Sequence, residues 1–182
     1  MEKIKKIMVV TGTRAEYGLL KPVMKAIKNN PQLELLLAVT GAHFEDLFGS
    51  TVNEIIEDGF SISANVKTTI GNTYADMSNS LGQGVVGFTE AILKLKPDIV
   101  LVLGDRVETF SAALSAYYLT IPIAHIHGGD KSTGGCLDDS ARHAISKLAQ
   151  IHFAATERSA ERLRMMGEEP WRVHTVGAPG ID

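Results

Sequence analysis

Residues 98–104 read Asp-Ile-Val-Leu-Val-Leu-Gly, and this stretch decides the fold. Its five consecutive apolar residues, three of them β-branched, predict a strand that is buried on both faces. The polar segment 104–108 (GDRVE) leads into residues 107–119, whose apolar spacing predicts a helix. A buried strand that passes through a polar turn into a helix is the repeating unit of a fold with a mostly parallel sheet.

The same unit recurs on both sides of this stretch. Apolar runs predict further strands at 5–11, 33–40, 61–66, 121–127, 151–156 and 172–176. Amphipathic segments predict helices at 16–29, 44–58, 72–95, 138–148 and 157–166. Gly82, Gly84 and Gly87 either weaken the helix at 72–95 or let it pack closely against a neighbour. The alternation predicts an α/β, Rossmann-like parallel sheet with helices on both faces.

Composition and charge exclude several classes of protein. The 182 residues are 45% hydrophobic and 21% charged, which is typical of one compact globular domain. The net charge of −3 argues against a dedicated nucleic-acid binder. No apolar run is long enough for a transmembrane helix, and the first residues lack the features of a secretory signal. A single cysteine, Cys136, cannot form an intrachain disulfide, so we expect a reduced, cytoplasmic location.

The end of the chain predicts the domain organisation. We expect residues 1–176 to form one Rossmann-like domain. Residues 177–182 (GAPGID) follow the last predicted strand without a helix, and their glycines and proline are typical of a linker. We therefore expect this segment to begin a connection to a second domain that lies outside this chain.

The candidate functional residues lie in the turns that follow the predicted strands. In open parallel sheets, ligands bind beyond the carboxyl ends of the strands. The polar, glycine-rich segments 12–16, 41–43, 104–108 and 127–138 all take that position. We expect them to line one crevice.

Two of these turns carry arginines suited to an anion. Arg14 lies where a helix begins, and a helix amino end together with a guanidinium group favours phosphate. The segment matches neither the dinucleotide fingerprint nor the P-loop, so the alternative is a plain turn with Arg14 paired to a surface carboxylate. In the turn at 104–108, Asp105 is a candidate general base or sugar ligand, and Arg106 a candidate phosphate ligand. The alternative there is that Asp105 and Arg106 form a structural ion pair and that Glu108 is an acid at the start of the helix.

The segment 125–130 (HIHGGD) allows three interpretations. Its two histidines are two residues apart, which places them on one face of a strand and makes a metal half-site with Asp130 conceivable. The interpretation that we favour over metal is one buried, hydrogen-bonded histidine and one loop histidine. A third is acid–base chemistry by His127 or Asp130.

The helix predicted at 138–148 opens with two acids. Asp138 and Arg142 are four residues apart and so share one helical face. They form either an ordinary surface ion pair or a site acid that an arginine orients. His43, which follows the strand at 33–40, is uninformative by itself.

Six motifs in order resemble the amino-terminal half of the hydrolysing nucleotide-sugar 2-epimerases, which include the UDP-N-acetylglucosamine 2-epimerases of sialic-acid biosynthesis. The resemblance covers essentially the whole chain and rests on the segments GTRAEYGLLKPV (12–23), TGAHF (40–44), GDRVE (104–108), HIHGGD (125–130), DDSARHAISKLAQIHFAATERSAERL (138–163) and VGAPGID (176–182). It implies the first of two Rossmann-like domains in a glycosyltransferase-B-like arrangement.

The resemblance also implies a reaction. UDP-N-acetylglucosamine loses a proton from C2 and UDP from C1, and water then adds to the glycal to give N-acetylmannosamine, with no metal and no NAD. By position, Asp105, Asp138 and Arg142 resemble the family's catalytic set, Arg14 and Arg106 its nucleotide contacts, and His43 a crevice histidine. Many relatives have glutamate where this chain has His127, so either His127 or Asp130 is expected to replace it.

Other functions stay open at this stage. A relative of the same family that acts on a GDP-linked or modified N-acetyl sugar fits the motifs, as does a glycosyltransferase or a non-catalytic nucleotide-sugar module on the same scaffold. A metal hydrolase on the two histidines is a further alternative. The family resemblance implies a possible homodimer. It also implies that the missing domain supplies much of the nucleotide site, so that the 182-residue chain alone turns over little substrate.

Overall fold

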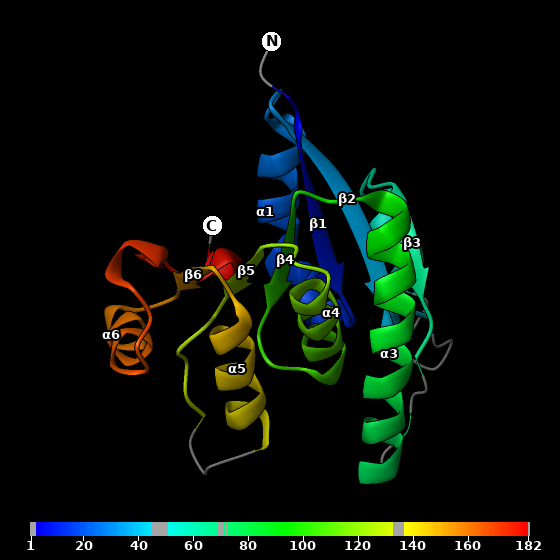
Figure 1. Ribbon diagram of the computed structural model, residues 1–182. Coiled ribbons are helices and arrows are strands. Elements are labelled where there is room, and N and C mark those ends of the chain that lie inside the picture. The colour runs from blue at the N-terminus through cyan, green and yellow to red at the C-terminus, as the bar shows by residue number, and fades with distance from the viewer. Residues whose placement is uncertain (1–2, 45–50, 69–70, 72, 133–136, 182) are drawn as a thin grey trace.

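The computed structural model describes residues 3–44, 51–68, 71, 73–132 and 137–181, and it contains a twisted sheet between two layers of helices (Figure 1). All strand pairings are parallel, and the order in the sheet is β3-β2-β1-β4-β5-β6-β7. The predicted α/β, Rossmann-like sheet is thus confirmed. The strands are β1 (Lys5–Thr11), β2 (Leu33–Thr40), β3 (Ile62–Val66), β4 (Ile99–Leu103), β5 (Ile123–Ile126), β6 (Ile151–Ala154) and β7 (Val173–Thr175).

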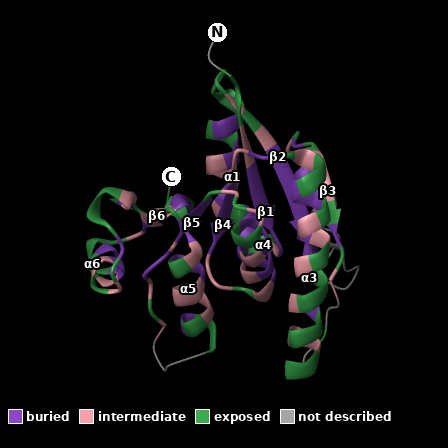
Figure 2. Cartoon of the chain, in the orientation of Figure 1, coloured by how far each residue is buried: buried purple, intermediate pink, exposed green. Residues whose placement is uncertain are grey.

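The two faces of the sheet have separate cores because side chains alternate along each strand. On one face, Val9 and Leu37 pack against α1 (Arg14–Asn29) and α2 (Thr51–Glu57). On the other, Met8 and Val100 pack against α3 (Tyr74–Leu95), α4 (Val107–Tyr118) and α5 (Leu137–Leu148). The last helix, α6 (Glu157–Met165), packs on β6 and β7. Buried residues are therefore concentrated in the central strands β1, β2, β4 and β5 (Figure 2).

Most predicted elements agree with the structure to within two residues, and two differences concern the first and second helices. The first helix begins earlier than predicted because Thr13 and Glu16 form a capping box, in which each side chain bonds the backbone of the other. The helix predicted at 44–58 is confirmed only over Thr51–Glu57. Residues 41–44 form a short 3₁₀ turn, α2 spans only Thr51–Glu57, and residues 45–50 lie outside the described part of the chain.

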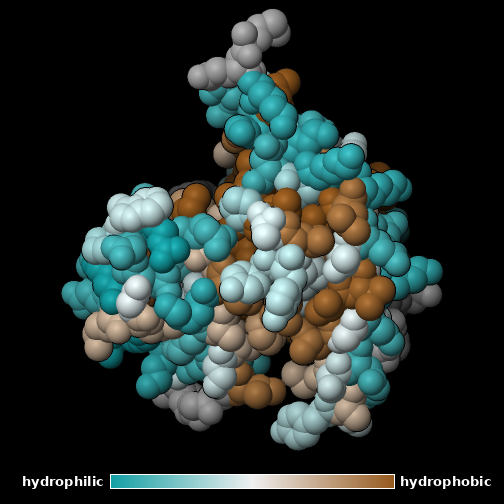
Figure 3. Space-filling model, in the orientation of Figure 1, coloured by the Kyte–Doolittle hydropathy of each residue, from teal (hydrophilic) through white to brown (hydrophobic). Residues whose placement is uncertain are grey.

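Gly84 and Gly87 serve close packing, a Cβ at Gly82 would meet nothing within 4 Å, and none of the three interrupts α3. A Cβ at Gly87 would lie 2.7 Å from Cγ1 of Val66, and one at Gly84 would collide with Ser111 of α4. These glycines let α3 approach both β3 and α4, which settles the choice left by the sequence in favour of packing. On this side of the molecule, apolar surface lies over α3 and α4 (Figure 3).

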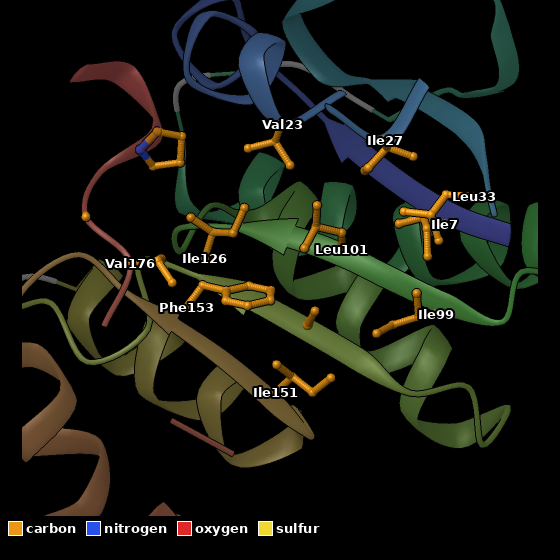
Figure 4. Close-up of a pocket in the computed structure, with 13 residues that line it drawn as sticks. Ile7, Val23, Ile27, Leu33, Ile99, Leu101, Ile126, Ile151, Phe153 and Val176 are labelled. Atoms are coloured by element: carbon orange, nitrogen blue, oxygen red, sulfur yellow. The ribbon is translucent and has the colours of Figure 1, made fainter. Parts of the chain in front are cut away.

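On the α1 face of the sheet, apolar side chains of β4, β5 and β6 stand beside α1 without a helix over them. A groove of about 390 Å³ opens there, and its walls are almost entirely apolar (Figure 4). The segment predicted as a linker runs along its edge: Gly177 and Pro179 line the groove, and the turn η4 (Pro179–Ile181) packs against α1. That these residues begin a connection to a second domain stays a prediction.

Candidate functional site

The most buried charged pair of the candidate set lies directly beyond the central strand β4. Asp105 follows Gly104, whose φ of +78° turns the chain sharply out of the strand. Its carboxylate forms an ion pair with Arg142 of α5, and both side chains are about 85% buried, with 15% and 13% exposed. Burial lowers the pKa of Arg142 from its ordinary value. The sequence pointed to Asp138, one turn away, as a partner of Arg142, and the structure adds an ion pair with Asp105, which is 37 residues away in the sequence.

A cavity of about 440 Å³ opens beside this pair, at the amino ends of α3, α4 and α5. Asp105 and Asp138 both line it, so the structure brings these two predicted catalytic acids to one cavity. The rest of its lining is mostly apolar and comes from Tyr74, Met77 and Leu81 of α3, Val107 and Phe110 of α4, and Leu137, Ala141 and Ala144 of α5.

Arg106 is held by an acid that the sequence analysis treated only as a helix-start residue. Nε of Arg106 lies 3.4 Å from Oε2 of the buried Glu108, while about half of the arginine side chain stays exposed. Glu108 fits between two loops, and a Cβ at Gly41 would lie 2.7 Å from its Oε1. Gly41, with a φ of +60°, is therefore required for this approach. Only the acidic residue type within GDRVE hinted at this role.

The other arginine, Arg14, stands at the outer rim. Its side chain is 74% exposed and its Nε lies 3.1 Å from Oε2 of Glu54. This is the arrangement of the plain alternative, an arginine paired to a surface carboxylate, and phosphate binding by Arg14 stays a proposal. Beneath it, the buried Glu16 accepts hydrogen bonds from the backbone of Gly12 at 2.8 Å and Thr13 at 3.0 Å. Burial raises the pKa of Glu16.

His43 is fully buried at the end of β2. Its Nε2 lies 3.0 Å from Oγ1 of Thr11 and its Nδ1 lies 2.6 Å from Oγ1 of Thr51. Burial lowers its pKa to about 4, so the ring is neutral near pH 7. Both ring nitrogens are occupied inside the protein, and this geometry suits a residue that fixes the edge of the sheet.

The two histidines of HIHGGD have different surroundings. His125 is fully buried, with Nδ1 3.1 Å from Oγ of Ser146 and Nε2 2.7 Å from the carbonyl oxygen of Gly104. Burial lowers its pKa to about 4. His127 lies beyond the strand, in a left-handed backbone conformation, and bonds Asp130. The expectation that they share a strand face is wrong because β5 ends at Ile126. The structure shows the favoured alternative, one buried histidine and one loop histidine.

The buried histidines predict how stability depends on pH. Folding lowers the pKa of His43 and of His125 from 6.5 to about 4, so between these values the unfolded chain binds more protons. The free energy of unfolding is therefore expected to fall as the pH falls from 6.5 toward 4, by about 2 kcal/mol for each histidine between pH 7.5 and 5. Urea denaturation at the two pH values measures this loss. His43→Gln should reduce this loss by about 2 kcal/mol, the contribution of one histidine, and an undiminished loss in that variant would contradict the assignment.

The described residues lack two further features. They contain no cluster of three histidine, cysteine, aspartate or glutamate side chains that is placed to bind a metal ion. Within the same residues, no helix combines the length and the apolar character that crossing a bilayer requires. Cys136 and residues 133–135 lie outside the described part of the chain.

Comparison with known proteins shows the fold and the family to which the chain belongs. The fold is Rossmann-like, and it matches glycosyltransferase-B-like solved structures over about half of their length. A crystal structure of UDP-GlcNAc 2-epimerase from Neisseria meningitidis bound to UDP-GlcNAc superimposes with a TM-score of 0.86 at 26% identity, over 97% of this chain and 47% of that one. The family model described as UDP-N-acetylglucosamine 2-epimerase matches residues 25–182, and the chain belongs to that family.

Curated relatives cover almost all of this chain. The UDP-N,N'-diacetylbacillosamine 2-epimerase (hydrolyzing) of Legionella pneumophila is 46% identical over 98% of this chain and 47% of its own length. The polysialic acid biosynthesis protein P7 of Escherichia coli is 36% identical over 98% of this chain and 46% of its own length. The chain therefore spans about half the length of these relatives.

Proposed function

We propose that the chain is the amino-terminal half of a hydrolysing nucleotide-sugar 2-epimerase. The observation that carries this proposal is the Asp105–Arg142 ion pair beside the cavity that Asp138 also lines. Removing two charged side chains from water costs free energy, and a chain retains such a pair most readily where it does chemistry. The pair lies at the carboxyl edge of the sheet, where nucleotides and their derivatives bind in open α/β folds.

The side chains at the carboxyl edge of the sheet, called the rim below, each have a role in the proposed elimination and hydration. Asp105 and Asp138 approach the sugar from neighbouring walls of one cavity and exchange protons around C1 and C2. Arg142 fixes the orientation of the Asp105 carboxylate. The departing diphosphate needs cations. Arg106, with its exposed half, and Arg14 at the outer rim are the proposed anion contacts.

The remaining site residues shape or complete the rim. His127 and Asp130 are the proposed replacement for the glutamate that many relatives carry, and they bond each other at 2.8 Å. His43 takes part by holding the end of β2 in place. The proposed reaction uses no metal and no NAD, and the homodimer and the cytoplasmic location stay predictions.

A second candidate sugar has a specific observation in its favour. Apart from Asp105 and Asp138, the cavity presents mainly apolar side chains, among them Met77, Leu81 and Phe110. Such a lining suits methyl and acetamido groups better than hydroxyl groups, which lose hydrogen bonds to water when they are buried. A UDP-linked diacetamido sugar fits this lining, as in the name of the relative from Legionella pneumophila.

The experiment that tests the proposal incubates the complete polypeptide with one UDP-sugar and no acceptor. UDP-N-acetylglucosamine and UDP-N,N'-diacetylbacillosamine are compared, and products are identified by NMR. We expect UDP and a free sugar of inverted configuration at C2, with the diacetamido substrate giving the higher kcat/KM. Turnover only after an acceptor sugar is added would identify a glycosyltransferase instead. The 182-residue chain alone serves as the control in which turnover is negligible.

A further inference from the structure

A continuous series of hydrogen bonds joins the end of β5 to the start of α6. Oγ of Ser159 donates to Oδ1 of Asp130 at 2.6 Å, and the second oxygen, Oδ2, lies 2.8 Å from Nδ1 of His127. Thr156, the N-cap of α6, lies 2.8 Å from the same serine hydroxyl. Both oxygens of the Asp130 carboxylate are thus occupied, and this fixes its orientation toward the imidazole.

The charge state of Asp130 fixes the tautomer of His127. Burial by itself would raise the pKa of Asp130, but the hydrogen bonds from His127 and Ser159 outweigh it, and the pKa lies below the ordinary value. An ionised carboxylate only accepts hydrogen bonds, so the ring proton of a neutral His127 must be on Nδ1. Nε2 then carries a lone pair. This atom is buried and has no hydrogen-bond partner among the described residues.

The backbone holds His127 in a costly conformation. Its φ is +63°, a left-handed value that costs a residue with a side chain on the order of 1 kcal/mol. The turn is held from two sides, since the amide of His127 donates to the carbonyl oxygen of Phe153 and Arg162 of α6 donates to that of Gly129. Residues in strained backbone conformations occur most often at functional sites, where the surrounding structure holds them in place.

The sheet register places the backbone of His127 beside that of Gly104, the residue before Asp105. Leu103 and Ile126 are aligned in neighbouring strands, and the amide of Gly104 donates to the carbonyl oxygen of Ile126 at 3.0 Å. The chain leaves the sheet at two neighbouring positions. His127 follows β5, and Gly104 and Asp105 follow β4. Parallel neighbouring strands lie about 4.8 Å apart, so both groups belong to one rim.

We propose that His127 is the base that removes the C2 proton, and that Asp130 and Ser159 are positioning residues that act through it. The assignment rests on the proposed function. Nε2 takes the proton, the electrons of the C2–H bond form the C1–C2 double bond, and the C1–O bond breaks as the nucleoside diphosphate leaves with its electron pair. The imidazolium that forms faces the Asp130 carboxylate, which stabilises its charge.

The tautomer can be read without any substrate. Long-range ¹H–¹⁵N spectra of the histidine rings in the ¹⁵N-labelled chain at pH 7.5 should show His127 protonated on Nδ1. His127→Gln assigns the signal. Asp130→Ala should shift His127 to the Nε2-protonated form, whereas Asp98→Ala, at the opposite end of the sheet, should leave it unchanged. A wild-type ring protonated on Nε2, or a tautomer that survives Asp130→Ala, would overturn the arrangement.

Kinetics of the complete polypeptide test the assigned roles. With the better of the two UDP-sugars, His127→Gln should abolish the exchange of the C2 proton with solvent. Asp130→Ala should lower kcat by about 10- to 100-fold with little change in KM, and Ser159→Ala by a smaller factor. Wild-type kcat in Asp130→Ala would refute the positioning role while the epimerase function stands. A wild-type protein that is inactive on both sugars would refute the function, and the NMR spectra would still decide the arrangement. If Asp130→Ala fails to fold, Ser159→Ala and the wild-type tautomer carry the test.

Discussion

Replacing Asp105 by asparagine is expected to lower kcat of the complete polypeptide by about 1,000-fold or more. The substitution keeps the size of the side chain but removes its ability to accept a proton and to pair with Arg142. General acid–base catalysis contributes about 10²- to 10⁴-fold, and loss of the pair leaves the buried guanidinium without its carboxylate. Steady-state assays with a UDP-sugar measure the effect.

A matched control separates chemistry from folding in this experiment. Asp98→Asn makes the same change at the amino end of β4, where the carboxylate accepts the backbone N–H of Lys6, far from the cavity. It should leave kcat within about twofold of wild type, since surface changes away from a site have small effects. A kcat for Asp105→Asn within tenfold of wild type would remove Asp105 from the chemistry.

The second large effect concerns stability. Gly129→Ala is expected to lower the free energy of unfolding by about 3 kcal/mol. Gly129 has a φ of +77°, and an added Cβ would collide with the backbone oxygen of Ser159 and lie 2.9 Å from Cγ of Leu163. The turn that carries Asp130 must then move away from α6. Urea denaturation measures the change.

Gly167→Ala is the matched control for Gly129→Ala. Gly167 also has a left-handed backbone, with a φ of +91°, but a Cβ there would meet nothing within 4 Å. Its substitution should cost only the backbone strain, about 1 kcal/mol. Equal losses in the two variants would mean that the turn moves away from α6 at no cost, and the predicted effect of the collision would be wrong.

The sequence was most informative where one physical signal dominates. The apolar run at 98–104 became β4 at the centre of the sheet, between β1 and β5. The rule that ligands bind beyond the carboxyl ends of parallel strands then placed Asp105 correctly at the rim. Local patterns were sufficient here because strand burial and the direction of the chain are local properties.

Contacts between distant elements could not be predicted in the same way. The sequence offered Asp138 as the partner of Arg142 because helical spacing is local, whereas the Asp105 contact depends on how α5 packs beside α4. Likewise, nothing in the sequence indicated that Ser159 reaches Asp130, because the two are 29 residues apart. The left-handed backbone of His127 was also hidden, since glycine, not histidine, is the usual residue there.

The most direct test of the central claim is the isotope content of the product formed in deuterated water. Acids, a histidine and guanidinium groups at one edge of the sheet are proposed to exchange the proton at C2 of a UDP-linked sugar. The complete polypeptide should therefore release a free sugar with one deuterium at C2 and the opposite configuration at that carbon. A released sugar that keeps its original hydrogen and configuration at C2 would show that the C1–O bond is cleaved without proton transfer, and the account would be wrong.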